Sequence, residues 1–281
     1  MPLRYRSLFR DDIFRGRVYV VTGGGSGIGR CVAHELCFLG ASVAIIGRRA
    51  QKLATVVSEI NSLGGSVSAH ECDVREQEVV ERVISSVVAQ YGRIDGLCNN
   101  AGGQYPSTIE NISLNGWDAV VKNNLYAPFI VSLACYRQWF KDHGGSIVNV
   151  LADFWGSMPE MAHSGAARAG AKSFTETAAL EWAPSAVRVN AVAPGWIRSS
   201  GLDSYPESYR AEITKWPQLV PLQRLGTVSE VSAAIVFLLS DAASFITGTT
   251  LRVDGGVPNV RPHWPARPGR PYKPYDGFAE Q

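Results

Sequence analysis

A glycine-rich segment near the start of the chain has the composition and spacing of a phosphate-binding turn. The sequence TGGGSGIG occupies residues 22–29, directly after the apolar run VYVV and directly before a stretch with helical periodicity. Its glycines permit a tight turn and let backbone N–H groups approach an anion, whose charge the start of the following helix also favours. Glycines that only turn the chain are the alternative, but the strand and helix around them favour binding of a dinucleotide pyrophosphate.

The end of the second predicted strand, IIGRR at residues 45–49, indicates which dinucleotide is bound. A carboxylate there would accept hydrogen bonds from the adenine ribose and would repel a 2′-phosphate. Gly47 stands in that place, and Arg48 and Arg49 follow with guanidinium groups suited to bidentate phosphate contacts. The pattern favours NADP(H), with at least one of the two arginines on the phosphate; solvated surface charges are the alternative.

A second group of polar residues, His163, Ser164 and Arg168, falls at the start of a predicted helix. Ser164 and Arg168 are four residues apart and so project from one helix face. They can donate hydrogen bonds but supply no strong acid, because a serine has no phenol-like pKa and an arginine stays protonated. His163 either assists them or only packs and caps the helix. A serine hydrolase is disfavoured, since HSG is not the GxSxG elbow.

Parallel strands joined by helical crossovers are expected to position these groups. Short β-branched runs alternate with amphipathic stretches from residue 17 to residue 253. We predict one doubly wound α/β domain, a Rossmann fold, because 281 residues suffice for one large core. Its seven strands would span Val18–Thr22, Val43–Gly47, Val67–Cys72, Ile94–Cys98, Ile147–Leu151, Arg188–Val192 and Thr250–Val253.

Charge, cysteine content and hydropathy exclude several classes of function. The chain carries 27 basic and 25 acidic residues without a cluster, so neither nucleic acid nor a membrane is expected as a partner. Five scattered cysteines lack the paired spacing of a metal site, and no metal is expected. Neither a signal-peptide core nor a bilayer-length apolar stretch is found, which predicts a cytoplasmic protein with a small-molecule ligand.

Three segments lie outside the regular alternation. Residues 1–15 form an N-terminal extension to a domain at 16–256. Residues 196–225 are rich in aromatics and helix breakers and resemble a substrate lid, whose rings either line an apolar pocket or pack on one another. Residues 257–281 form a proline-rich, extended tail, and its aromatic residues, Trp264, Tyr272, Tyr275 and Phe278, favour docking on a neighbouring subunit over free movement.

Several motifs together resemble the short-chain dehydrogenase/reductase family. They are TGGGSGIG, CDV at 72–74, NNAG at 99–102, Asn124 in NNL and PGWIRS at 194–199, and the resemblance covers about residues 16–256. It implies a seven-stranded parallel sheet and a homo-oligomer, a tetramer or dimer, assembled through the helices at about 112–143 and 160–183. Oligomerisation is therefore an expectation taken from the family.

The resemblance also implies which residues hold the cofactor. Asp73 and Val74 would border the adenine, Asn100, Ala101 and Gly102 would line the central ribose, and Ile197 and Ser199 would hold the nicotinamide carboxamide. The full predicted NADP(H) site comprises Thr22, Gly23, Ser26, Gly27, Ile28, Gly29, Arg48, Arg49, Asp73, Val74, Asn100, Ala101, Gly102, Arg168, Pro194, Gly195, Ile197 and Ser199.

The catalytic positions depart from the family pattern of Asn, Ser, Tyr and Lys. Asn124 is retained, Ser164 takes the tyrosine position and Arg168 the lysine position, while the serine position falls on Leu151 or Asp153. In the family, the lysine lowers the tyrosine pKa so that the tyrosine exchanges a proton with a carbonyl or alcohol. The pair in this chain cannot do so. Asp153 is either a proton donor or a structural partner of Arg168.

The segments MAHSGAARAG, GGQYPSTIENIS, GSIVNV and ALEWA resemble peroxisomal trans-2-enoyl-CoA reductases, and SxxxR resembles the SxxxK of 2,4-dienoyl-CoA reductases. The resemblance implies NADPH-dependent reduction of a conjugated C=C bond, in which donors stabilise an enolate oxygen. The predicted catalytic residues are Asn124, Ser164, Arg168, His163 and Asp153. A carbonyl reductase or alcohol dehydrogenase for a fatty or terpenoid, citronellol-like substrate is the alternative, and a dinucleotide-binding protein with little turnover is a third hypothesis.

Overall fold

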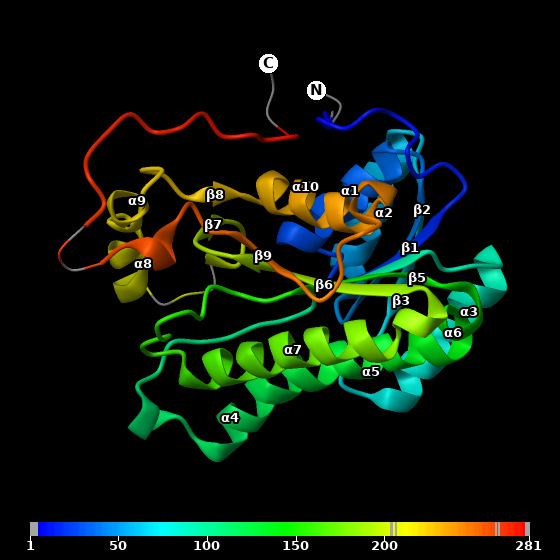
Figure 1. Ribbon diagram of the computed structural model, residues 1–281, viewed down its shortest axis with the longest axis horizontal. Coiled ribbons are helices and arrows are strands. Elements are labelled where there is room, and N and C mark those ends of the chain that lie inside the picture. The colour runs from blue at the N-terminus through cyan, green and yellow to red at the C-terminus, as the bar shows by residue number, and fades with distance from the viewer. Residues whose placement is uncertain (1–4, 203–204, 206, 262, 264, 279–281) are drawn as a thin grey trace.

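The computed structural model describes residues 5–202, 205, 207–261, 263 and 265–278, and its centre is a seven-stranded parallel sheet (Figure 1). The strand order is β3-β2-β1-β4-β5-β6-β9. The order reverses between β1 and β4, and ligands of such sheets bind outside the carboxyl ends of the strands at that point. The strands are β1 (Val18–Thr22), β2 (Ser42–Gly47), β3 (Ser66–Glu71), β4 (Gly96–Asn99), β5 (Gly145–Val150), β6 (Val187–Pro194) and β9 (Thr250–Val253).

Two helical layers cover the sheet, and each layer has its own apolar core. The first layer packs through residues such as Leu36, Val56 and Ile235. The second packs through residues such as Ile84, Val131 and Ala178. The first layer is α1 (Gly27–Phe38), α2 (Ala50–Ser62) and α10 (Val228–Leu239), and the second is α3 (Gln77–Tyr91), α5 (Ala127–Cys135) and α7 (Ala162–Glu181). The predicted doubly wound α/β fold and its seven strands are confirmed.

One long helical stretch of the second layer contains two wider turns. It runs through α4 (Leu114–Val121), the π-helical segment η2 (Lys122–Tyr126), α5, a second π-helical segment η3 (Tyr136–Phe140) and α6 (Lys141–His143). Asn124 lies inside η2, fully buried. A π-helical turn shifts the register of the side chains that follow it and often marks a functional site.

The segment between β6 and α10 carries a small parallel pair of strands, β7 (Ile197–Arg198) and β8 (Gly226–Thr227). Between them lie α8 (Glu207–Ile213) and α9 (Trp216–Leu219), at one end of the molecule in Figure 1. Aromatic rings stack on one another here, Trp196 on Trp216 and Tyr205 on Tyr209. Of the two predicted alternatives for these rings, the contacts show packing within the segment.

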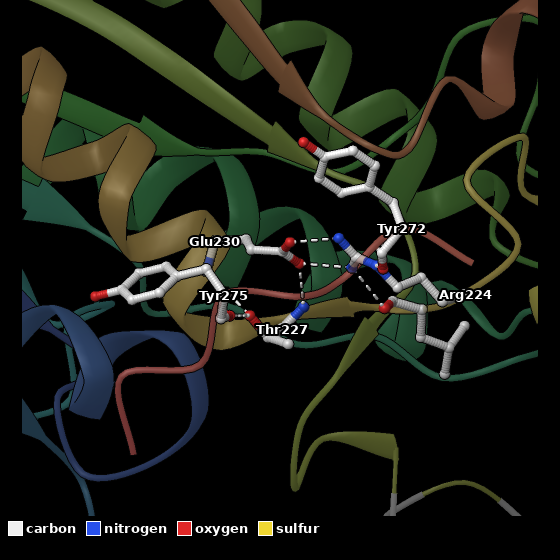
Figure 2. A network of polar contacts seen from close by, with 6 residues as sticks. Arg224, Thr227, Glu230, Tyr272 and Tyr275 are labelled. Carbon is white, nitrogen blue, oxygen red and sulfur yellow. Dashed lines mark hydrogen bonds and ion pairs between the residues drawn. The ribbon is translucent and has the colours of Figure 1, made fainter. Parts of the chain in front are cut away.

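The carboxyl-terminal tail crosses back over α10 to the N-terminal segment, so both ends lie on the same side of the molecule (Figure 1). Figure 2 shows how it is held: Arg224 donates through Nε to the Tyr272 carbonyl (2.6 Å) and also contacts Glu230, while the Thr227 hydroxyl donates to the Tyr275 carbonyl (2.5 Å). Beyond these residues, Gly277 donates through its N–H to Ser229 Oγ (2.9 Å).

These contacts show that the tail docks on its own domain, and docking on a neighbouring subunit stays a prediction. The Phe278 ring packs edge-on against Tyr5, with ring centroids 4.8 Å apart. The guanidinium of Arg30 lies 4.6 Å from the same ring. Aromatic rings, side chains and backbone groups of the same domain therefore bind the tail. Trp264, also predicted to dock, lies outside the described residues.

Among the described residues, no helix has both the length and the apolar composition to cross a membrane. The same part of the chain contains no group of three or more His, Cys, Asp and Glu side chains placed to bind a metal ion.

Candidate active site

The glycine turn between β1 and α1 requires its glycines for conformation and for space. Gly23 and Gly27 adopt left-handed conformations, with φ of +68° and +54°. A Cβ at Gly29 would lie 2.4 Å from the Gly23 carbonyl oxygen and 2.4 Å from Asn100 Nδ2. Ser26 precedes α1 without a side-chain cap to its N–H groups. The turn therefore presents the amino end of a 12-residue helix that has no side-chain cap.

Thr22 and Asn100 join this turn to the loop after β4. The Thr22 hydroxyl oxygen accepts hydrogen bonds from the N–H groups of Asn100 and Ala101, both at 3.0 Å. Asn100 Nδ2 donates to the carbonyl oxygens of Thr22 (3.0 Å) and Gly23 (3.3 Å). The Asn100 amide nitrogen is thus used inside the protein, where it supports the glycine turn.

Two exposed arginines follow β2, the strand next to β1 in the sheet, and an acidic residue follows β3. Arg48 and Arg49 are both exposed. Hydrogen bonds from Arg75 lower the pKa of Asp73, and the charge of Arg48 lowers it further. Arg48 and Asp73 follow the ends of two paired strands, since Gly47 of β2 lies opposite Glu71 of β3. The pairing of Asp73 with Arg75, at 2.9 Å from Nε to Oδ1, was not predicted from sequence.

Asn124 and Arg168 meet beneath Gly102. Asn124 Oδ1 accepts from the Gly103 N–H (3.1 Å), and its Nδ2 donates to the carbonyl oxygens of Gly103 (2.7 Å) and Val120 (2.9 Å). A Cβ on Gly102 would lie 2.8 Å from Asn124 Oδ1 and 2.8 Å from an Arg168 nitrogen. The absence of a side chain at Gly102 lets α7, η2 and the loop after β4 converge.

Arg168 is a buried cation with spare hydrogen-bonding capacity. Burial lowers its pKa to about 10, so it remains protonated at neutral pH. One terminal nitrogen donates to the Val150 carbonyl at the end of β5 (2.6 Å), and Nε has no partner among the described residues. A buried donor without a partner is costly, which favours a polar ligand at this point.

Ser164 is fully buried on α7, one turn before Arg168, and forms a hydrogen bond that sequence analysis did not predict. Its hydroxyl donates to Gln104 Oε1 (2.5 Å), and Gln104 Nε2 in turn donates to the hydroxyl of Tyr205 (3.2 Å). Gln104 follows the two glycines after β4. In the sequence, a long polar side chain directly after these two glycines could have indicated that Gln104 bonds to a residue of the site.

His163 is a buried neighbour of Ser164 with a single polar contact. Its Nδ1 accepts from the Ser164 N–H (2.9 Å), and Nε2 has no partner within the described part of the chain. The Tyr105 ring packs edge-on against it, with centroids 4.7 Å apart. Because Nδ1 accepts, Nε2 carries the proton of the neutral ring.

Of the two roles left open for Asp153, pairing with Arg168 is not seen among the described residues, where Asp153 Oδ1 and Arg168 Nε both lack a hydrogen-bond partner. No ion pair joins the two within the described residues, and the Asp153 N–H instead donates to the Pro194 carbonyl (2.9 Å). Burial raises the pKa of the Asp153 carboxyl, and the nearby Asp254 carboxylate raises it further. Asp254, in VDGG after β9, is a neighbour that sequence analysis missed.

The remaining predicted cofactor residues lie where β6 ends. Pro194 is the last residue of β6, Ile197 is buried in β7, and a Cβ on Gly195 would lie 2.8 Å from the Asp254 Cα. A Cβ on Gly27 would lie 3.9 Å from that of Ser199, so this segment faces the glycine turn. Val74 is buried beside Asp73, and Ile28 is half-buried in the first turn of α1.

A family model described as Enoyl-(Acyl carrier protein) reductase matches residues 23–258. The chain belongs to the short-chain dehydrogenase/reductase family. A probable 2,4-dienoyl-CoA reductase of Bacillus subtilis is 38% identical to this short-chain dehydrogenase/reductase over 244 residues, 85% of this chain and 96% of that protein. The predicted family is confirmed, and the chain is an oxidoreductase.

Solved structures agree with this assignment. The citronellol catabolism dehydrogenase (AtuB) of Pseudomonas aeruginosa PAO1 is similar to this short-chain dehydrogenase/reductase with a TM-score of 0.82 and 50% identity, covering 90% of this chain and 100% of that one. A protein of Beutenbergia cavernae assigned as an NAD(P)-dependent gluconate 5-dehydrogenase, with NADP bound at low occupancy, has a TM-score of 0.80 and 33% identity over 86% of this chain and 97% of its own.

Proposed function

We propose that this oxidoreductase uses NADPH to reduce the conjugated C=C bond of an enoyl-CoA or a related thioester. The observation that carries the proposal is the buried pair Ser164 and Arg168, one helical turn apart beside Asn124 and Gly102. The pair offers hydrogen bonds and positive charge without a strong acid. Relatives named 2,4-dienoyl-CoA reductases support the substrate class.

The residues present fit a dinucleotide. The glycine turn leaves the amino end of α1 without a side-chain cap, and the Nε of Arg168 lacks a partner among the described residues. Bound NADPH would supply the hydride. The turn would hold the pyrophosphate, Arg48 with Arg49 the 2′-phosphate, and Arg168 the nicotinamide ribose hydroxyls.

The rest of the predicted cofactor site follows the same order along the sheet edge. Asp73 and Val74 would border the adenine, and Ala101 with Gly102 the central ribose. Ile197 and Ser199 would hold the nicotinamide carboxamide, because their segment faces the glycine turn. Asn100 would act through the turn, since its amide nitrogen is already bonded there.

Ser164 would donate a hydrogen bond from its hydroxyl to the thioester oxygen. When hydride reaches the β-carbon of the substrate, negative charge gathers on that oxygen, and a donor already in place stabilises it. The buried charge of Arg168 adds positive potential at short range. Asp153, whose carboxyl is held toward the protonated form by burial and by Asp254, is the acid that we propose for the α-carbon.

The test is product analysis with NADPH and a trans-2-enoyl-CoA, together with a matched aldehyde. Loss of the double bond is expected. The Ser164→Ala variant should lower kcat by about 10²-fold, the usual effect of removing one oxyanion donor, with NADPH affinity unchanged. A Ser173→Ala variant, further along α7, is the control and should keep full activity. Unchanged turnover in the Ser164 variant would contradict this role.

A carbonyl reductase or alcohol dehydrogenase for an apolar, citronellol-like substrate is the second candidate. The 50% identity to the Pseudomonas citronellol catabolism dehydrogenase favours it. Here Ser164 or His163 would face the reacting oxygen directly. Reduction of citronellal with the enoyl thioester untouched would select this alternative, while tight NADPH binding without turnover of either compound would indicate a binding protein.

We further propose that the chain forms a homo-oligomer through the helices α4, α5 and α7. Large apolar side chains are exposed along them, with Leu114 at 85%, Phe129 at 44% and Leu180 at 78%. Apolar side chains grouped on one face are typical of a subunit interface.

A further inference from the structure

Three residues from three separate parts of the chain form one hydrogen-bonded series at the candidate active site. Tyr205 belongs to the lid, Gln104 to the loop after β4 and Ser164 to α7. The Gln104 amide lies between the two hydroxyls, 3.2 Å from Tyr205 Oη through Nε2 and 2.5 Å from Ser164 Oγ through Oε1. Gln104 thus joins the lid to a buried residue that the proposed function requires as a donor.

The direction of this series decides what Ser164 can do. A serine hydroxyl has one proton. As the bonds run here, that proton points to Gln104 Oε1, so Ser164 offers a ligand only its lone pairs. In this direction the serine cannot donate to a substrate oxygen.

A half-turn of the Gln104 amide reverses the series without loss of a hydrogen bond. The Tyr205 hydroxyl would then donate to Oε1, and Nε2 would donate to Ser164 Oγ. The serine proton would be left for the substrate oxygen, and it would be more acidic because its own oxygen accepts a hydrogen bond. Both directions keep the two hydrogen bonds of Gln104, but the reversed one leaves the buried Ser164 proton without an acceptor until a ligand oxygen binds, so the ligand and the lid together select between them.

We propose that Gln104 is a positioning residue that couples the lid to the hydrogen-bonding direction of Ser164. Tyr205 stacks on Tyr209 of α8, with ring centroids 5.3 Å apart, so a displacement of α8 would also displace its hydroxyl. A lid that places this hydroxyl as a donor turns the amide and frees the serine proton. The inference rests on the proposed function, because Ser164 must act as a donor to the substrate.

Two substitutions at Gln104 distinguish an effect of hydrogen-bond direction from the loss of the hydrogen bonds themselves. Gln104→Glu gives an ionised carboxylate that only accepts and so holds the serine proton in the unproductive direction. Gln104→Met keeps the length of the side chain and removes both hydrogen bonds. At about pH 8, kcat should fall roughly 100-fold in the glutamate variant and roughly tenfold in the methionine variant, with KM nearly unchanged.

The pH profile gives a signature that a merely structural role would not produce. A protonated glutamate again has one donor and one acceptor, so the Gln104→Glu variant should regain activity as the pH falls through its pKa. Wild type and Gln104→Met share any gain that comes from protonation of Asp153, so the signature is the additional gain of the Gln104→Glu variant relative to both. Tyr205→Phe should lower kcat by less than Gln104→Glu, since Gln104 can still donate to Ser164.

The same substitutions in a Ser164→Ala background complete the test, with the probe, trans-2-decenoyl-CoA or citronellal, that wild type reduces. Gln104→Glu and Tyr205→Phe should there have no further effect on kcat. If Ser164→Ala slows turnover but the Gln104 effects add to it in full, or if Gln104→Glu shows no additional gain at low pH, the coupling is wrong and the proposed function stands. If Ser164→Ala leaves turnover unchanged, or neither probe is reduced, the proposed function itself fails and the coupling with it.

Discussion

Arg168 shows how one residue can change the chemistry of a conserved fold. Burial lowers its pKa only to about 10, so it holds a full charge beside Asn124 and Gly102. A guanidinium that stays protonated cannot take part in proton transfer, but its positive charge stabilises an anion throughout the reaction. An arginine in this place therefore suits a reaction that gathers charge on an oxygen and takes its proton elsewhere.

Arg48 should determine the preference for the phosphorylated dinucleotide. It follows β2 beside the end of β3, where we propose that the adenine end of the cofactor lies. Arg48→Ala should weaken NADPH binding about 10- to 100-fold, the usual value of a charge-assisted hydrogen bond, and should leave NADH binding almost unchanged. Dissociation constants from calorimetry measure both.

The control for Arg48 removes an equal charge elsewhere. Arg137 is exposed on η3, in the opposite helical layer. Arg137→Ala should alter neither affinity, which removes net charge as an explanation. Equal weakening of NADPH and NADH in the Arg48 variant would exclude a contact to the 2′-phosphate.

At the scale of elements, the sequence predicts strands better than the details of helices. The apolar runs locate all seven strands to within two residues. The signal is strongest where a strand is buried along its length, as in β1 and β5, and weaker in the partly exposed β3 and β9. The π-helical turn at Asn124 leaves no such signal, since it depends on a bond between the Asn124 side chain and the Val120 carbonyl. Gln104 and Asp254 were missed for a similar reason: their partners are distant in sequence.

Helices α1 and α10 enclose a buried carboxylate that should make stability depend on pH. Glu35 accepts hydrogen bonds from the hydroxyls of Tyr5 (3.0 Å), Ser7 (3.1 Å) and Ser232 (2.5 Å). Burial raises its pKa above the ordinary value of 4.5, despite these bonds. Cys31 on α1 and Tyr275 in the tail are the other titratable groups close to it.

A raised pKa means that the folded state binds this proton more tightly than the unfolded chain. The contribution to stability is complete below the unfolded pKa and is lost as the pH rises through the folded pKa. Glu35→Gln removes this loss, so the melting temperature of the variant should rise relative to wild type as the pH increases from acid to neutral. Parallel melting curves across that range would contradict the assignment.

Glu59 on α2 provides a control of opposite sign. Hydrogen bonds from Arg30 and His34 outweigh burial there and lower its pKa. Glu59→Gln should therefore lose stability relative to wild type as the pH rises through the folded pKa of Glu59. Opposite slopes in the two variants would show that local burial and pairing, rather than loss of one negative charge, set the pH dependence.

At the scale of the whole molecule, the two chain ends close over one layer of the fold. The Arg6 N–H donates to the Gly277 carbonyl (2.9 Å), and the Tyr275 hydroxyl donates to the Arg6 carbonyl (2.7 Å). Composition predicts an extended tail, because prolines remove helix and ladder bonds. It does not predict the docking site, because the groups that bind the tail, such as Arg224, Ser229 and Tyr5, are far apart in the sequence.

Arg224 connects this tail to the end of the predicted lid at residues 196–225, so its substitution should affect both segments. Its guanidinium pairs with Glu230, and the two side chains are only 15% and 20% exposed. Arg224→Ala would leave the Glu230 carboxylate without its cation and the Tyr272 carbonyl without its donor. We expect a cost of about 2 to 3 kcal/mol, which lowers the melting temperature by roughly 5 to 10 °C.

The matched control for Arg224 is Tyr272→Ala, which removes an exposed ring but keeps the backbone carbonyl that accepts from Arg224. Its melting temperature should stay within a degree or so of wild type. Since β8 pairs with β7, Arg224→Ala should also raise KM for the substrate more than it weakens NADPH binding. If Arg224→Ala is as stable as Tyr272→Ala, then the contacts of Arg224 with the tail and with Glu230 do not stabilise the protein.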